Sequence, residues 1–250
     1  MIANETFILV TGAMGGIGRT VVSKLRENGY KVIETDIRLP LEKTSNWEFV
    51  QIDLSQFVHD EEYSLKKTQE IYSASLGLPC KGIISNAAEQ VVKPLRDFNS
   101  REILDLISIN SLATWALTAK FWDNLSSNNG KVISISSVHN ILSKPGFGAY
   151  AISKAAMSAV TRAISLEAEG RFAAVSISPG AIETTMLLEG FEGFPQKYRD
   201  LIDILPTRRL GQPEDVAELV TFILETESNY LNGSDIRIDG GISGRLHDPL

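Results

Sequence analysis

A run of four apolar residues, Phe7-Ile8-Leu9-Val10, leads directly into the stretch TGAMGGIG, residues 11–18. Four glycines within seven residues cost much backbone entropy, so they indicate a tight turn or a backbone that another group approaches closely. Their spacing is G-x-x-x-G-x-G rather than G-x-G-x-x-G, and the sequence lacks the Gly-Lys-Ser/Thr ending of a phosphate loop. A turn that only packs a helix against a strand is the alternative interpretation.

Short apolar runs alternate with longer amphipathic stretches along the chain. Near-continuous apolar runs are typical of strands that are buried on both faces of a parallel sheet. Strands are expected at 7–10, 31–35, 81–85, 131–136, 173–178 and 234–239, and helices at 17–28, 60–76, 100–125, 150–169 and 213–226. This alternation predicts a single α/β domain over residues 1–250, with a doubly wound, Rossmann-like parallel sheet and helices on both faces. The segment 184–211 is expected to be a long irregular loop that covers a substrate.

The composition narrows the possible functions. A chain of 250 residues with 43% hydrophobic and 22% charged residues is typical of a globular protein with one large core. The net charge of −7 argues against nucleic-acid binding, and no apolar run is long enough to span a membrane. The single cysteine, Cys80, and the scattered His59, His139 and His247 do not suggest a metal site. We expect a cytoplasmic protein without a signal peptide or a metal.

An acidic residue ends the second expected strand. Asp36 follows Gly18 by 18 residues, where a carboxylate would accept hydrogen bonds from both hydroxyls of an adenosine ribose. A helix N-terminus at the glycine turn would attract the pyrophosphate of the same ligand. Because the carboxylate would repel a 2′-phosphate, the sequence favours NAD(H) over NADP(H), although Arg19 and Arg38 could weaken that repulsion. A simple strand-end turn residue is the alternative.

A possible acid–base group opens the fourth expected helix, at Tyr150-Ala-Ile-Ser-Lys154. Residues at i and i+4 share one helix face, so the phenol and the ammonium can meet in one site. A free tyrosine has a pKa of about 10, and a nearby cation lowers that pKa. The phenol could then exchange a proton with an alcohol or carbonyl oxygen, which Ser137 could also bind. A solvated helix face and a turn serine are the alternatives.

Together these residues resemble the short-chain dehydrogenase/reductase family over essentially the whole chain. TGAMGGIG is similar to the family's cofactor turn, and Ser137, Tyr150 and Lys154 fall at its catalytic positions. Other matching segments are Asp53-Leu54, beside the adenine; Ser85-Asn86-Ala87-Ala88, which stands where Asn-Asn-Ala-Gly is usual; Asn110, at the family's asparagine; Pro179 to Thr184, around the nicotinamide carboxamide; and 209–215 and 238–241, near the C-terminus.

The resemblance implies an enzyme that interconverts a secondary alcohol and a ketone by hydride transfer with NAD. Tyr150 would exchange the hydroxyl proton, Ser137 would position the oxygen, and Lys154 would lower the tyrosine pKa and hold the nicotinamide ribose. Asn110 would distort its helix and hold a water that passes protons onward from Lys154. The implied cofactor-binding residues are Gly12, Met14, Gly16, Ile17, Gly18, Asp36, Asp53, Leu54, Asn86, Ala87, Ala88, Tyr150, Lys154, Pro179, Gly180, Ile182 and Thr184.

We expect the substrate to be a small alcohol or ketone. The sequence does not distinguish among sugar alcohols, hydroxy acids, steroids and acyl thioesters. Ser137, His139, Tyr150 and Met186 are the expected substrate residues. A wider, mostly apolar lining is expected from Glu89, Phe147, Leu187, Phe191, Phe194 and Tyr198. A non-catalytic dinucleotide sensor, a lyase or epimerase, and an NADP(H)-dependent 3-oxoacyl-thioester reductase are the alternative functions.

The resemblance also implies a homo-oligomer, either a dimer or a tetramer. The contacts would involve the helices at 100–125 and 150–169, with the C-terminal strand and tail at a second contact. Trp115, Phe121 and Trp122 could supply apolar contact area in such an assembly, or they could belong to the core of the monomer.

Overall fold

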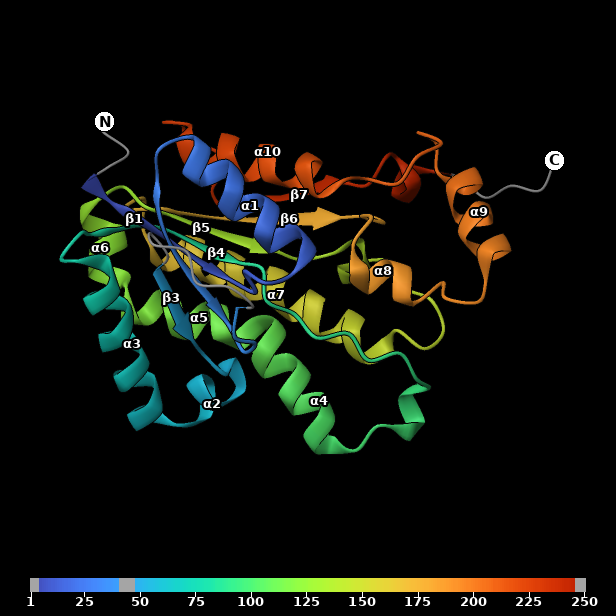
Figure 1. Ribbon diagram of the computed structural model, residues 1–250, viewed down its shortest axis with the longest axis horizontal. Coiled ribbons are helices and arrows are strands. Elements are labelled where there is room, and N and C mark those ends of the chain that lie inside the picture. Colours follow the sequence, from blue (N-terminus) through green and yellow to red (C-terminus); the bar gives the residue numbers. More distant parts are fainter. Residues whose placement is uncertain (1–4, 41–47, 246–250) are drawn as a thin grey trace.

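The computed structural model describes residues 5–40 and 48–245 and contains a seven-stranded parallel sheet (Figure 1). The strand order is β3-β2-β1-β4-β5-β6-β7, so the chain reverses direction across the sheet between β1 and β4. This order is a doubly wound α/β arrangement, in which ligands bind outside the carboxyl ends of the strands at the switch point. The predicted fold class is confirmed. The strands are β1 (Phe7–Thr11), β2 (Lys31–Asp36), β3 (Glu48–Gln51), β4 (Cys80–Ser85), β5 (Lys131–Ile135), β6 (Ala173–Pro179) and β7 (Asp235–Ile238).

Helices cover both faces of the sheet (Figure 1). α1 and α10 pack together on one face, while α3, α5 and α7 lie on the other. The α-helices are α1 (Gly16–Glu27), α2 (Leu54–His59), α3 (Glu61–Ser75), α4 (Ser100–Ile107), α5 (Ala113–Lys120), α6 (Trp122–Ser127), α7 (Gly148–Glu167), α8 (Thr185–Glu189), α9 (Pro195–Ile204) and α10 (Pro213–Glu225). Short 3₁₀ turns are η2 (Leu95–Asp97), η4 (Val138–Asn140) and η5 (Ile242–Gly244), and η3 (Ser108–Leu112) is a π-helix.

The central strands are buried on both faces, as their sequences predict. Every residue of β1, β5 and β6 is buried. Alternate residues of β1 enter different cores: Phe7 and Leu9 pack on one side of the sheet, and Ile8 and Val10 pack on the other. This two-residue period fixes the register of the strand and holds its carboxyl end, at Thr11, level with the ends of its neighbours.

Several expected elements differ from the structure. The strand β3 was not predicted, because Glu48-Phe-Val-Gln is a short, partly polar edge strand without a recognisable apolar run. The helix expected over 60–76 is preceded by the separate helix α2, and the two meet at Asp60, which caps α3. The helix expected over 100–125 is divided by the π-helix η3 and breaks again at Phe121.

The segment 184–211 is not irregular, since it contains α8 and α9. Thr184 caps the first of these helices, and Pro195 opens the second. In Figure 1 both helices lie beyond the carboxyl end of β6. Within the described ranges, none of the helices combines the length and the apolar character that crossing a membrane requires.

The three aromatic residues considered for subunit contact divide between surface and core. Trp115 on α5 is 55% exposed, whereas Phe121 is completely buried and Trp122 packs its ring edge-on against Phe172 at a centroid distance of 4.9 Å. Of these three residues, Trp115 therefore offers the most apolar contact area to another chain, while Trp122 is half-buried. The C-terminal tail, also considered as a contact, lies beyond residue 245 and outside the described residues.

Candidate active site

The glycine turn brings three segments of the chain into close contact. Gly12 has a φ of +64°, and a Cβ there would lie 2.6 Å from the Cα of Ala87, after β4. A Cβ on Gly18 would lie 2.1 Å from the carbonyl oxygen of Gly12, and one on Gly16 would lie 3.0 Å from the Cγ2 of Thr184. The glycines therefore allow β1, the end of β4 and the segment after β6 to meet at one point.

The N-terminus of α1 is open at this point. Its N-cap is Gly15, no side chain of the described residues caps it, and its first turn holds no acidic residue. Side chains of Asp53, Asp60, Asn99 and Thr184 cap α2, α3, α4 and α8, whereas α7 and α9 resemble α1 in having no side-chain cap from the described residues. Because first-turn N–H groups have no partner within their own helix, those of α1 are suited to bind an anion such as a pyrophosphate.

Asn86 and Thr11 connect the ends of β1 and β4. The Nδ2 of Asn86 donates to the carbonyl oxygens of Thr11 at 3.2 Å and Gly12 at 3.0 Å. The Oγ1 of Thr11 accepts from the N–H groups of Asn86 and Ala87, both at 3.1 Å. Thr11 was not among the predicted residues, although it belongs to the quoted stretch. Ser85 and Ala88 depart from the family's usual residues, but the side chains in these hydrogen bonds are those of Thr11 and Asn86. The network is therefore present in spite of the two departures.

Asp36 lies at the end of β2 with a side chain that is only 5% exposed. Its Oδ2 accepts from the N–H of Met14 in the glycine turn at 2.9 Å. Its Oδ1 accepts from the backbone N–H of Arg38 at 3.0 Å and from the Nε of Arg38 at 3.2 Å. The expected proximity of an arginine is thus realised as an ion pair.

The pair Asp53-Leu54 follows β3 and has clear structural roles. The Oδ1 of Asp53 accepts from the N–H of Gln56 at 3.1 Å, and its own N–H donates to the hydroxyl of Tyr63 at 2.9 Å. Leu54 is 8% exposed and belongs to one of the two cores. Both residues therefore stabilise the start of α2, and any adenine contact would use their remaining surface.

The predicted nicotinamide-side segment starts at Pro179, the last residue of β6. The N–H of Gly180 donates to the carbonyl of Ile238 at 3.0 Å, and a Cβ on Gly180 would lie 2.9 Å from the Cα of Asp239. Ile182 is buried and forms a parallel bridge with Gly211. These contacts hold the segment beside the glycine turn, which Thr184 touches through Gly16.

The structure brings Ser137, Tyr150 and Lys154 together at the carboxyl end of β5. Ser137 follows β5, is 8% exposed, and accepts from the N–H of His139 at 3.2 Å. Lys154 lies one helical turn after Tyr150 on α7, and its Nζ is 5.7 Å from the centroid of the tyrosine ring. The same Nζ donates to the carbonyl oxygen of Ile135 at 2.8 Å, and Lys154 is buried.

Tyr150 and Lys154 are both buried, and burial shifts the pKa of each group. Burial raises the pKa of Tyr150 to about 12, and a hydrogen bond from Ser137 acts in the opposite direction. Burial lowers the pKa of Lys154 to about 7. Burial is the largest influence on both pKa values, because each buried group loses the hydration of its charged form, and the Lys154 ammonium faces the Ile135 carbonyl.

Asn110 is completely buried in the π-helix η3, so the expected helix distortion is present. Its Oδ1 accepts from the N–H of Glu89 at 2.8 Å, and its Nδ2 donates to the carbonyl of Glu89 at 2.9 Å and to the Oγ of Ser153 at 2.9 Å. The side chain thus holds the segment after β4 against α7. Both hydrogens of the side-chain amide are used in these bonds. A water held by Asn110 would therefore have to donate a hydrogen bond to an oxygen of this residue.

An aromatic cluster borders Tyr150 on its outer side. The rings of His139 and Phe147 stack at 4.7 Å between centroids, and both meet Tyr150 edge-on. The Nζ of Lys144 lies 4.3 Å from the centroid of Phe147. Burial, and then the nearby Lys144, lower the pKa of His139, so this environment favours the neutral imidazole. Sequence reasoning missed Lys144, which carries no motif.

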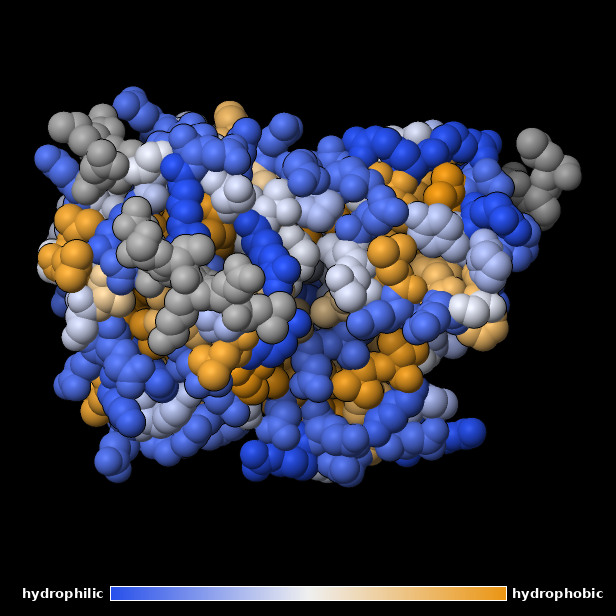
Figure 2. Space-filling view, in the orientation of Figure 1, coloured by the Kyte–Doolittle hydropathy of each residue, from blue (hydrophilic) through white to orange (hydrophobic). Residues whose placement is uncertain are grey.

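Met186 lies on α8 and is 46% exposed, and Glu89 is also exposed. On the face in Figure 2, hydrophobic side chains gather around α8 and below it. A cavity of about 490 Å³ between α8 and α9 includes two residues that the sequence predicted. Its lining residues are Leu188, Glu189, Phe191, Glu192, Gly193, Pro195 and Tyr198.

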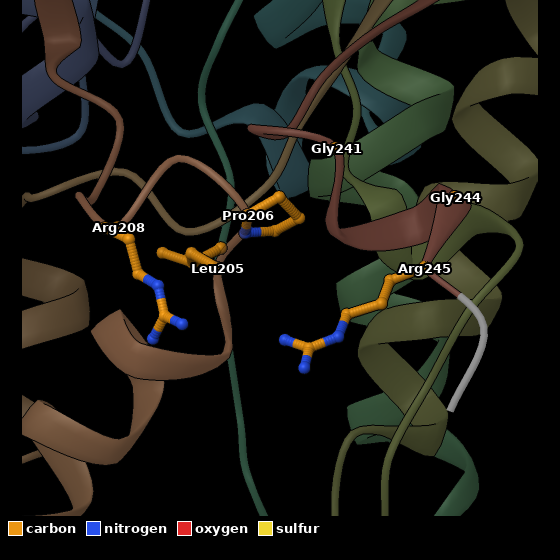
Figure 3. Close-up of a pocket in the computed structure, with 6 residues that line it drawn as sticks. All are labelled: Leu205, Pro206, Arg208, Gly241, Gly244 and Arg245. Carbon is orange, nitrogen blue, oxygen red and sulfur yellow. The ribbon is translucent and has the colours of Figure 1, made fainter. Parts of the chain in front are cut away.

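A second cavity, of about 450 Å³, lies between the end of α9 and η5 (Figure 3). Its lining residues are Leu205, Pro206, Arg208, Gly241, Gly244 and Arg245, none of which was a predicted site residue. The guanidinium groups of the two arginines donate to main-chain carbonyls of Asp203 and Ile204. Within the described part of the chain, no group of His, Cys, Asp and Glu is arranged to hold a metal ion.

Comparisons with known proteins agree with this geometry. Residues 12–243 match the family described as Enoyl-(Acyl carrier protein) reductase. The acetoacetyl-CoA reductase of Allochromatium vinosum is 25% identical over 247 residues, which cover 94% of this chain and 97% of the relative. The glucose 1-dehydrogenase of Gluconobacter oxydans is 27% identical over 250 residues, which cover 94% and 91%.

The fold is also found among solved structures. The ligand-free aldohexose dehydrogenase of Thermoplasma acidophilum has a TM-score of 0.89 at 21% identity, over 99% of this chain and 98% of that chain. At this identity the likeness shows the fold, whereas the family match extends over most of the sequence. The chain therefore belongs to the short-chain dehydrogenase/reductase family of NAD(P)-dependent oxidoreductases.

Proposed function

We propose that this protein is an NAD(H)-dependent oxidoreductase that interconverts a secondary alcohol and a ketone. The observation that carries the proposal is the convergence of Ser137, Tyr150 and Lys154 at the same sheet edge as the open N-terminus of α1. The coenzyme supplies or accepts the hydride. The protein orients both reactants and moves the proton.

In the direction of alcohol oxidation, the phenolate form of Tyr150 would take the hydroxyl proton, and the hydride would pass from the carbinol carbon to the oxidised coenzyme. Ser137 donates a hydrogen bond to the same substrate oxygen. The Lys154 ammonium favours the phenolate electrostatically, so it opposes the effect of burial on Tyr150. Because burial lowers the pKa of Lys154 to about 7, a substantial part of this lysine is neutral at pH 7, and ligand groups that solvate its ammonium would increase the charged fraction.

The residues present fit a nicotinamide dinucleotide. The open first turn of α1 would bind the pyrophosphate, and Asp36 would bind the adenosine ribose. Asn86 to Ala88 would border the nicotinamide ribose, and Pro179 to Thr184 would border the carboxamide. We propose a preference for NAD because the Asp36 carboxylate is buried beside the turn, while Arg38 is the residue that could admit a 2′-phosphate.

On the substrate side, we propose that His139 and Met186 contact the substrate and that 184–211 covers it. The hydroxyl of Tyr198 on α9 donates to Glu183 at 3.0 Å, and Gln212 donates to the same carboxylate at 2.8 Å. These bonds connect the covering segment directly to the nicotinamide-side segment, so closure and cofactor binding would be coupled.

We also propose a cytoplasmic homo-oligomer of one-domain subunits. The exposed Trp115 on α5, together with Ile152 and Leu166 on α7, supports a contact between copies through these helices. The only cysteine, Cys80, is buried and free, which agrees with a reducing compartment.

A 3-oxoacyl-thioester reductase is the second candidate function. It is favoured by one observation, the name of the acetoacetyl-CoA reductase to which the chain is similar over nearly its whole length. Such an enzyme would use the same Ser137, Tyr150 and Lys154 in the reducing direction.

The test is a panel of sugar alcohols, hydroxy acids, secondary cyclic alcohols including steroids, and 3-oxoacyl thioesters, each with NAD and NADP in the appropriate redox state. Coenzyme absorbance reports turnover. The proposal expects oxidation of a secondary alcohol with NAD⁺ and loss of that activity in Tyr150→Phe. Tight NAD⁺ binding without turnover of any compound would instead support a non-catalytic sensor.

A further inference from the structure

The carboxylate of Asp235 lies close to the candidate active site and connects three elements that form it, namely η4, α7 and β6. Asp235, at the start of β7, accepts from Ser178 at 2.5 Å through Oδ1 and from Ser158 at 2.8 Å through Oδ2. The Nδ2 of Asn140 donates to the same Oδ2 at 2.5 Å. Ser158 belongs to α7, Ser178 immediately precedes Pro179 on β6, and Asn140 ends the turn that follows Ser137.

The amide of Asn140 is oriented by this contact. Its Nδ2 also lies 2.9 Å from the Oγ of Ser158 and 3.1 Å from the Oγ of Ser178. Its Oδ1 is buried and finds no hydrogen-bond partner among the described residues. The opposite orientation of the amide would place Oδ1 against the carboxylate of Asp235. The site therefore uses asparagine as a donor, at the cost of an unsatisfied acceptor.

The same network holds the other end of the turn. The Oγ of Ser136 donates to the carbonyl of Lys154 at 3.2 Å and lies 3.2 Å from the Oγ of Ser158. The N–H of Asn140 donates to the carbonyl of Ser137 at 3.0 Å. Ser137 thus lies between two residues that are both tied to α7, the helix that carries Tyr150.

We propose that Asn140 and Asp235 are positioning residues, whose hydrogen bond holds the turn with Ser137 and His139 against Tyr150. The catalytic part of this inference rests on the proposed function. Charge-assisted hydrogen bonds are short and strong, and a carboxylate with three donors restrains three segments at once. Displacement of a catalytic group by about 1 Å can cost about a hundredfold in rate.

The test exchanges the two groups. Asn140→Asp sets two carboxylates against each other and should lower kcat by about ten- to a hundredfold, with the KM for NAD⁺ changed by less than about threefold. The double variant Asn140→Asp/Asp235→Asn again pairs one amide with one carboxylate at unchanged net charge. It should recover kcat to within about threefold of the parent. Rates are measured with the best compound of the substrate panel.

A second readout does not depend on a substrate. The Cε1–Hε1 NMR signal of His139, assigned with His139→Gln, should shift in Asn140→Asp and return in the double variant, while that of His59 should stay constant. Asn28→Asp is the matched control, since Asn28, the exposed C-cap of α1, donates to the Glu225 carboxylate at 2.9 Å. It makes the same chemical change far from the turn and should alter neither kcat nor the His139 signal.

Parent-like kcat and His139 signal in Asn140→Asp would overturn the proposal, and so would a double variant as impaired as the single one. If Asn140→Asp does not fold, Asn140→Ala removes the donor without adding charge and should shift the same signal. If the parent turns over no compound of the panel, the proposed function fails, whereas the His139 spectrum still decides whether the pair positions the turn.

Discussion

Replacing Lys154 with methionine should remove a pH dependence of folding stability that the buried amine creates. Burial lowers the pKa of Lys154 from 10.5 to about 7, so between these values the unfolded chain binds more protons than the folded one. Stability then rises with pH across this window, and the penalty is complete below about pH 7. With about 1.4 kcal/mol for each pKa unit, the rise from about pH 7 to 9 is about 2 kcal/mol.

Methionine fills a similar volume without a charge, so the variant should lack this rise and be more stable than the parent near pH 7. Urea unfolding followed by tryptophan fluorescence measures both proteins at several pH values between about 7 and 9. Other buried amines, such as Lys131, contribute equally to both proteins, so the difference between the two pH curves isolates Lys154. Lys66→Met, at an exposed position of α3, should keep the parent's rise. Equal rises in the parent and in Lys154→Met, within about 0.5 kcal/mol, would refute the reasoning.

Tyr150→Phe should lower kcat by about two to four orders of magnitude with little change in NAD⁺ affinity, measured by steady-state rates and by a fluorescence titration; parent-like rates would move the chemistry elsewhere. Asp36→Ala should reduce the ratio of kcat/KM for NAD⁺ to kcat/KM for NADP⁺, because it removes the carboxylate that repels the 2′-phosphate. Equal kcat/KM values for the two coenzymes in the parent protein would contradict this prediction. Gly18→Ala should destabilise the fold by about 1–3 kcal/mol or more in urea unfolding, because its Cβ would overlap a carbonyl oxygen. Gly244→Ala serves as the control, since its Cβ would meet no atom of the described residues within 4 Å. Hydrogen exchange over 184–211 should slow when NAD⁺ and a substrate analogue bind; unchanged exchange would indicate a rigid surface segment.

The strongly buried strands and the long helices could be predicted because their hydrophobic period is set by burial. The edge strand β3 could not be predicted in this way. It pairs with β2 on one side, and Glu48 and Gln51 are partly or fully exposed, so β3 lacks a continuous apolar run. The helices within 184–211 carried ordinary signals, an N-cap at Thr184 and a proline at 195, which the surrounding glycines obscured. The distortion around Asn110 was expected only from the family resemblance, since the Asn110 side chain contacts Glu89, which lies 21 positions earlier in the sequence.

The predicted site residues were found by local motifs, and residues joined only by the fold were missed. Asn140 and Asp235 are 95 positions apart, and the strand order places β7 beside β6, so no short motif includes both. The lowered pKa of Lys154 was not predicted from the sequence for a similar reason. Its distance from Tyr150 follows from helical spacing, but its pKa follows from burial, which depends on the whole fold.

The glycine turn that opens the chain serves two separate requirements. Gly12, Gly16 and Gly18 would each bring a Cβ against atoms of the protein itself, so packing alone demands glycine there, whether or not a coenzyme binds. The case for an anion site rests instead on the helix that follows. A turn kept only for packing could cap α1 with a side chain, as Asp53 caps α2. Gly15 leaves those N–H groups free, close to the Asp36 carboxylate that holds Met14, and this combination favours a dinucleotide over packing alone.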